Sequence, residues 1–159
     1  MKILTWLEKH NKLSWFLTIF SVITIFILSS FTFNLSAYPD QITKDISFLT
    51  ITYHFMAFFC LSLFFTISWT KGKPNPKTFS ICFLLCVIYA LTDEIHQFFV
   101  PGRFLDVQDI RIDVLGIGVA QLIYTFHLIK KLLLKSDRKD LYSKKDINIE
   151  LKGGSKSNG

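Results

Sequence analysis

The sequence is poor in the residues and motifs that mark small secreted domains and many soluble enzymes. Only three of its 159 residues are cysteines, and all three lie inside long apolar stretches: Cys60, Cys82 and Cys86. A small secreted domain held together by disulfides is therefore excluded, because its cysteines would lie in solvent-exposed loops. Cys82 and Cys86 are four residues apart but are interpreted as small buried apolar side chains. The sequence has no glycine-rich phosphate loop, GxSxG motif or paired-cysteine zinc pattern.

Apolar residues, in contrast, are abundant and arranged in blocks. They make up 50% of the chain, aromatic residues make up 16%, and 17 residues are phenylalanine. Four blocks are each long enough to span a hydrocarbon core of about 30 Å; they cover approximately residues 13–35, 48–69, 79–100 and 110–134. The pattern predicts an all-α integral membrane bundle of four transmembrane helices.

The breaks between blocks support this division. The segment 71–77 contains Gly72, Pro74 and Pro76, which predict a tight hairpin, and Pro101 and Gly102 precede the last block. A cleaved signal peptide is the alternative for the first block, because Leu35-Ser36-Ala37 loosely resembles a cleavage site. The first block is, however, an uncharged stretch of 23 residues, which is longer than the apolar region of a signal peptide, about 7 to 15 residues.

The basic residues predict the orientation. Fifteen Lys and Arg residues fall before the first span, in the 71–77 hairpin, or at the end of the last span and beyond it, against three on the opposite side. Both termini are therefore predicted to be cytoplasmic in a multi-pass protein of the cell membrane. Residues 1–12 are expected at the membrane interface, 13–134 in the membrane domain, and 135–159 in a disordered basic tail. The charge of +6 is explained by this topology, so the expected partner is the bilayer and not nucleic acid.

Polar residues accumulate where the apolar pattern should exclude them, between residues 89 and 113. A charge at the bilayer centre costs about 2.5 to 3.5 kcal/mol, so the adjacent acids Asp93 and Glu94 require partners. Helical spacing places Tyr89, Asp93, His96 and Gln97 on one face of the third span, which we expect to point into the bundle.

Two other spans carry polar groups to a similar depth. His54 lies roughly 9 Å along the second span and Asp93 roughly 10 Å from the end of the third, counted from the same side of the membrane. Asp109 and Asp113 begin a face of the fourth span that continues with small residues, which allow close helix packing. The three sets predict one polar site open to the outer surface.

Charge balance leaves several chemistries open for this site. Five carboxylates, those of Asp93, Glu94, Asp106, Asp109 and Asp113, outnumber the nearby Arg103 and Arg111. Protonated carboxyls, charged histidines or a bound cation would restore the balance, and Asp109 and Asp113 are the candidate ligands for Mg²⁺ or Ca²⁺. Asp106 fits equally well as a carboxylate at a helix N-terminus, and Arg111 as a side chain that reaches the interface.

The run Asp-Glu-Ile-His-Gln-Phe-Phe-Val-Pro-Gly-Arg at 93–103, with Asp109, Gly116 and the upstream His54-Phe55, resembles the VanZ-like family of small membrane proteins. The family is named for a protein associated with low-level teicoplanin resistance, and the resemblance covers about residues 50–125. The chain departs from the family's usual Asp-Lys before the histidine, where it has Thr50-Ile51, and from the usual Asn at Asp113. The resemblance implies a role in the cell envelope.

The hypothesis from these residues is a site that binds or modifies a lipid-linked or phosphate-bearing envelope molecule. Its catalytic candidates are Asp93, Glu94 and His96, with Arg103 holding an anion. The substrate-binding candidates are His54, Tyr89, Gln97, Arg103, Asp109 and Asp113. A small ion- or proton-coupled transporter element and a non-catalytic membrane accessory protein are the alternatives. A purely structural hydrogen-bond network is the simplest competing interpretation of the acids.

Overall fold

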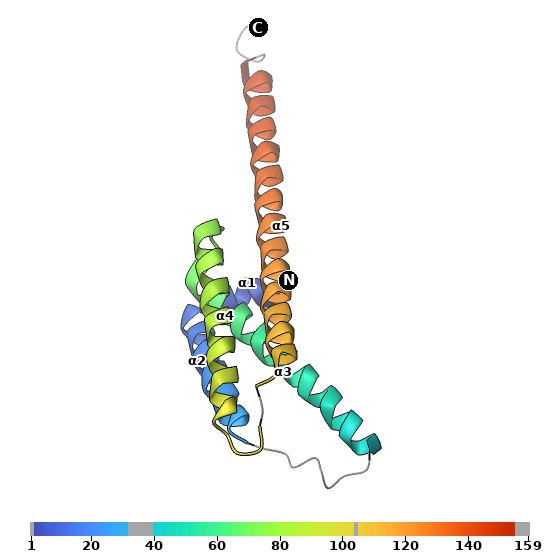
Figure 1. Ribbon diagram of the computed structural model, residues 1–159. Helices are drawn as coiled ribbons and strands as arrows, with labels where there is room; N and C mark the ends of the chain where they lie inside the picture. Colours follow the sequence, from blue (N-terminus) through green and yellow to red (C-terminus); the bar gives the residue numbers. More distant parts are fainter. Residues whose placement is uncertain (1, 32–39, 104, 155–159) are drawn as a thin grey trace. The chain divides into compact units, whose positions relative to one another are not determined.

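The computed structural model describes residues 2–31, 40–103 and 105–154, and every regular element in them is a helix (Figure 1). In chain order the helices are α1 (Lys2–Lys9), α2 (Asn11–Ser29), α3 (Asp40–Thr70), α4 (Pro76–Phe98) and α5 (Val107–Gly154). The chain forms two compact units, Met1–Thr125 and Phe126–Gly159. All of the site residues predicted above belong to the first unit.

Four of these helices are long and apolar enough to span a membrane, which confirms the predicted fold class. The candidate spans are Asn11–Ser29, Phe48–Thr70, Pro76–Phe98 and Val107–Arg138. They agree with the four predicted blocks in number and order. Most of their large apolar side chains are exposed, among them Phe16, Phe20, Leu84 and Leu122. Such surfaces suit contact with hydrocarbon and would be unfavourable in water.

The first span is shorter than the sequence predicts. Helix α2 ends at Ser29, so the expectation that it continues to about residue 35 is wrong for residues 30 and 31, and residues 32–39 lie outside the described part of the chain. The backbone N–H of Ser30 bonds to the carbonyl oxygen of Ile27 at 3.1 Å and that of Phe31 to the carbonyl oxygen of Leu28 at 3.2 Å, which tightens the last turn. Serine hydroxyls compete with the backbone for hydrogen bonds and favour helix ends.

The break between α3 and α4 is confirmed. Lys71 and Gly72 adopt positive φ angles of 51° and 74°, which ends α3. Asn75 then caps α4, because its side-chain oxygen accepts a hydrogen bond from the backbone N–H of Lys77 at 3.1 Å. Pro76 occupies the first turn, where its missing N–H costs nothing. Helix α4 therefore begins three residues before the predicted start at 79.

The segment after the last span is helical and not disordered. Helix α5 continues to Gly154, so the expectation of disorder from residue 135 is wrong through that point. Residues 135–154 include five lysines and two leucines and no proline, and two glycines stand where the helix ends. Lysine and leucine have high intrinsic helix propensity, and a continuing helix supplies the nucleus that an isolated peptide lacks.

Helices α3 and α5 approach closely at Gly116. A Cβ atom added there would lie 2.5 Å from the carbonyl oxygen of Phe55 and 3.2 Å from the backbone nitrogen of Phe59. The small residue therefore allows backbone to meet backbone, as predicted for this face of the last span. The buried apolar cluster beside it contains Ile25, Phe58, Leu61, Cys86, Ala90 and Ile117. These contacts set the rotation of the helices that carry the polar residues.

A polar contact joins α1 to α5, away from the acidic end of α5. The carboxylate of Glu8, which is 9% exposed, accepts a hydrogen bond from the hydroxyl of Tyr124 at 3.1 Å. The Tyr124 hydroxyl also lies 3.0 Å from that of Thr70. Because Tyr124 lies 11 residues beyond Asp113 on α5, about 16 Å separates it along the helix from the acidic end. The location of α1 at a membrane interface stays a prediction.

Candidate functional site

A buried histidine–aspartate pair joins α3 to α5. The Nδ1 atom of His54 lies 3.1 Å from Oδ1 of Asp113, and both side chains are 1% exposed. Asp109, one turn before Asp113, places Oδ2 at 3.8 Å from Nε2 of the same ring and is 19% exposed. The imidazole thus lies between two carboxylates, which compensates part of their charge in a region of low dielectric.

Glu94 brings α4 into the same site. One of its carboxylate oxygens accepts a hydrogen bond of 2.5 Å from the backbone N–H of Asp106, while the side chain is 1% exposed. Glu94 also interacts electrostatically with His54, Asp109 and Asp113. Groups from three helices therefore converge, although the residues that carry them are up to 59 positions apart in the chain.

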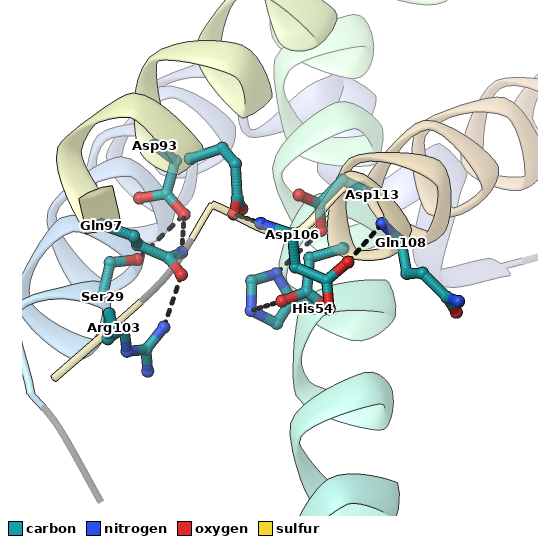
Figure 2. Close-up of polar contacts among 10 residues, drawn as sticks. Ser29, His54, Asp93, Gln97, Arg103, Asp106, Gln108 and Asp113 are labelled. Carbon is teal, nitrogen blue, oxygen red and sulfur yellow. Dashed lines mark hydrogen bonds and ion pairs between the residues drawn. The ribbon is translucent and has the colours of Figure 1, made fainter.

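A hydrogen-bonded row of four side chains leads from α2 to Arg103 (Figure 2). Oδ2 of Asp93 accepts hydrogen bonds from the hydroxyl of Ser29 and from Nε2 of Gln97, each at 2.9 Å. The carbonyl oxygen of Gln97 in turn accepts from Nη1 of Arg103 at 2.6 Å. Asp93 thereby orients the Gln97 amide so that its oxygen faces the guanidinium. The predicted shared face of Asp93 and Gln97 is confirmed.

The turn between α4 and α5 positions Arg103. Gly102 has a φ of 83°, a conformation that glycine adopts without strain, and the Arg103 N–H closes the turn onto the Val100 carbonyl at 3.1 Å. Asp106 then caps α5 by accepting from the N–H of Gln108 at 2.7 Å. Of the two interpretations of Asp106, a site acid or a carboxylate at a helix N-terminus, this hydrogen bond supports the second.

Two predicted site residues contact α2 instead of the His54–Asp113 pair. The Nε2 atom of His96 lies 3.1 Å from the Ser30 hydroxyl, and its ring stacks on Phe26 with centroids 4.6 Å apart. The hydroxyl of Tyr89 donates to the carbonyl oxygen of Val22 at 2.8 Å. A catalytic role of His96 stays a prediction, but its contacts differ from those of His54.

A sequence model of the VanZ/LLP1 family matches residues 13–130, which include all the groups described above. The chain belongs to the VanZ/LLP1 family. No curated protein and no solved structure matches it. Family membership therefore identifies the membrane domain but assigns no substrate to the residues at its polar end.

In this VanZ/LLP1 protein the predicted cation ligands are engaged by histidine. Asp113 contacts Nδ1 of His54 and Asp109 lies near Nε2, so the ring occupies the space between the two carboxylates. Among the described residues, no group of three or more His, Cys, Asp or Glu side chains is arranged to hold a metal ion.

Sequence reasoning missed three polar residues of the site. Ser29 and Ser30 contact Asp93 and His96, and two consecutive serines within the uncharged first block were the available signal. Tyr53 packs its ring edge-on against His54, with centroids 5.5 Å apart and an interplanar angle of 77°. Its buried hydroxyl interacts electrostatically with Asp93, Arg103 and Asp113. A tyrosine beside a buried histidine gives no distinctive sequence pattern.

Proposed function

We propose that this VanZ/LLP1 protein binds a phosphate-bearing, lipid-linked molecule at the outer end of its helix bundle, with Arg103 contacting the phosphate. The observation that carries the proposal is the small number of hydrogen bonds made by the Arg103 guanidinium. It is half-buried and makes one side-chain hydrogen bond within the described residues, to a neutral amide. Arginine has five N–H donors, and its planar fork suits the oxygens of a phosphate.

An apolar groove supports a lipid-linked ligand. A cavity of about 160 Å³ lies between α2, α3 and α4, lined by residues that include Val22, Leu61, Phe65, Leu85 and Tyr89. On α4, Tyr89 is one turn from Asp93, so the groove ends about 6 Å along the helix from the polar row. A hydrocarbon chain seated there would bring an attached phosphate toward Arg103.

Arg103→Ala should weaken the binding of phosphatidic acid by about 10- to 100-fold, because a hydrogen bond to a charged group contributes about 1.5 to 3 kcal/mol. The measurement is the affinity of the purified full chain in detergent micelles for a fluorescent phosphatidic acid. Arg111→Ala is the matched control, since Arg111 is exposed on α5 and its loss changes the net charge equally. Equal weakening by the two substitutions would show that charge alone attracts the lipid and would overturn the proposal.

The His54–Asp113 pair favours a second function, acid–base catalysis on the same ligand. Asp113 fixes the orientation of the ring, and Nε2 of His54 has no hydrogen-bond partner among the described residues. A histidine held by a carboxylate in this way can give its proton to the leaving alcohol as the bond from phosphorus to that oxygen breaks, and the water molecule that attacks phosphorus returns a proton to the ring. Both proposed functions include a location in the cell envelope and a site that faces the outer side of the membrane.

Hydrolysis of phosphatidic acid or phosphatidylglycerol, followed by mass spectrometry of the products, tests the catalytic function. We expect His54→Gln to lower turnover by at least about 100-fold, in the range of general acid–base catalysis, and His96→Ala to lower it by less than about threefold. The reverse order would assign the proton transfer to His96. Tight binding without turnover by the unsubstituted protein would exclude the catalytic function for these lipids and leave the binding function.

A further inference from the structure

Four buried polar atoms at the site have no hydrogen-bond partner among the described residues. They are the Tyr53 hydroxyl, Nε2 of His54, Oε2 of Glu94 and Oδ2 of Asp113. His54, Glu94 and Asp113 are each 1% exposed. Buried polar groups are nearly always satisfied, because a donor or acceptor left without a partner costs about as much as a lost hydrogen bond. Several such atoms in one place therefore point to a ligand.

The four atoms belong to one cluster. His54 bonds to Asp113, Tyr53 packs against the His54 ring, and Glu94 interacts electrostatically with both His54 and Asp113. They come from α3, α4 and α5. The partly exposed Asp109 and half-buried Arg103 border the cluster, since Asp109 approaches His54 and Arg103 interacts with Tyr53.

The chemistry of these atoms restricts the ligand. The carboxylate oxygens of Glu94 and Asp113 need donors, whereas the Tyr53 hydroxyl carries a proton that needs an acceptor. A ligand hydroxyl supplies both, because it donates one hydrogen bond and accepts others. An ammonium group donates only, would leave the tyrosine proton without an acceptor, and would be repelled by Arg103. A second phosphate could not donate to the carboxylates.

We infer that Tyr53, Glu94 and Asp113 form a subsite for a hydroxyl-bearing head group, of the glycerol or sugar type, next to the phosphate held by Arg103. The inference rests on the proposed function, which places the phosphate. Tyr53, which the sequence pattern did not single out, becomes a specificity-determining residue. The head group would replace three missing hydrogen bonds without adding a charge to the site.

Two lipids of equal charge test the subsite. Phosphatidylglycerol and phosphatidylethanol carry the same phosphodiester, but only the first has free hydroxyls. In competition against fluorescent phosphatidic acid in detergent micelles, we expect the full chain to bind phosphatidylglycerol at least about fivefold more tightly. Tyr53→Phe and Glu94→Gln should each reduce this preference to less than about twofold.

The controls make the same chemical changes at the Glu8–Tyr124 contact. Tyr124→Phe and Glu8→Gln remove a buried hydroxyl and a buried charge that bond to each other. Both should keep the preference for phosphatidylglycerol. If they lose it to the same extent as the site variants, the effect is a general loss of packing and the subsite is disproved.

The outcomes separate this inference from the proposed function. Equal affinity for the two lipids, together with a large effect of Arg103→Ala, overturns the subsite and leaves the phosphate contact. Tightest binding of phosphatidylethanolamine overturns it in favour of an ammonium ligand. Competition by glycerol 3-phosphate at the strength of phosphatidylglycerol supports the subsite with a soluble ligand, and competition by the lipid alone supports a lipid head group.

Discussion

Replacing His54 with leucine is expected to lower the free energy of unfolding by about 3 to 5 kcal/mol, the range found when one partner of a buried ion pair is removed. The reason is the environment of Asp113, which is 1% exposed and has a second carboxylate oxygen without a partner among the described residues. Without the imidazole, its charge would be buried with no compensation. The measurement is unfolding of the purified chain in detergent, followed by circular dichroism.

Two further variants separate loss of the pair from loss of volume. His54→Leu with Asp113→Asn removes the buried charge as well as its partner, so part of the stability should return, with a coupling of about 0.5 to 3 kcal/mol. His96→Ala removes a half-buried ring that has one hydroxyl partner, and it should cost only about 1 kcal/mol. A His54→Leu protein as stable as His96→Ala would show that the Asp113 carboxyl does not depend on the pair.

Gly116→Ala should destabilise the bundle by about 1 to 3 kcal/mol and weaken the site at the same time. The added methyl group would meet backbone atoms of Phe55 and Phe59, which cannot rotate away as a side chain could. Helices α3 and α5 would have to separate. Phe55 follows His54 in the chain and Gly116 is three residues after Asp113, so separation would lengthen the His54–Asp113 contact.

Gly118→Ala supplies the matched control two residues away on the same helix. A Cβ atom there has nothing within 4 Å, so the substitution should raise stability by up to about 1 kcal/mol through helix propensity. Thermal unfolding in detergent, combined with phosphatidic acid binding, measures both effects. Equal stability and binding of the Gly116 and Gly118 variants would disprove the importance of the close approach.

The sequence alone was sufficient to predict the four spans and the polar face of α4 that carries Asp93 and Gln97. Predominantly apolar runs of about 20 residues are expected to be helices in a bilayer, because a backbone without internal hydrogen bonds is too costly in hydrocarbon. Pro76 and Gly72 marked the α3–α4 turn for equally local reasons. The bond between Asp93 and Gln97 follows from their i, i+4 spacing. These features depend on neighbours within one or two turns.

Only the tertiary structure decided which distant groups meet. His54 pairs with Asp113 and Ser29 with Asp93 across 59 and 64 positions, and the buried Tyr53 hydroxyl interacts electrostatically with the same acids. Helical period fixes which residues share a face, but not the rotation and distance between helices. Those are set by packing, above all where Gly116 lets α5 rest on the backbone of α3.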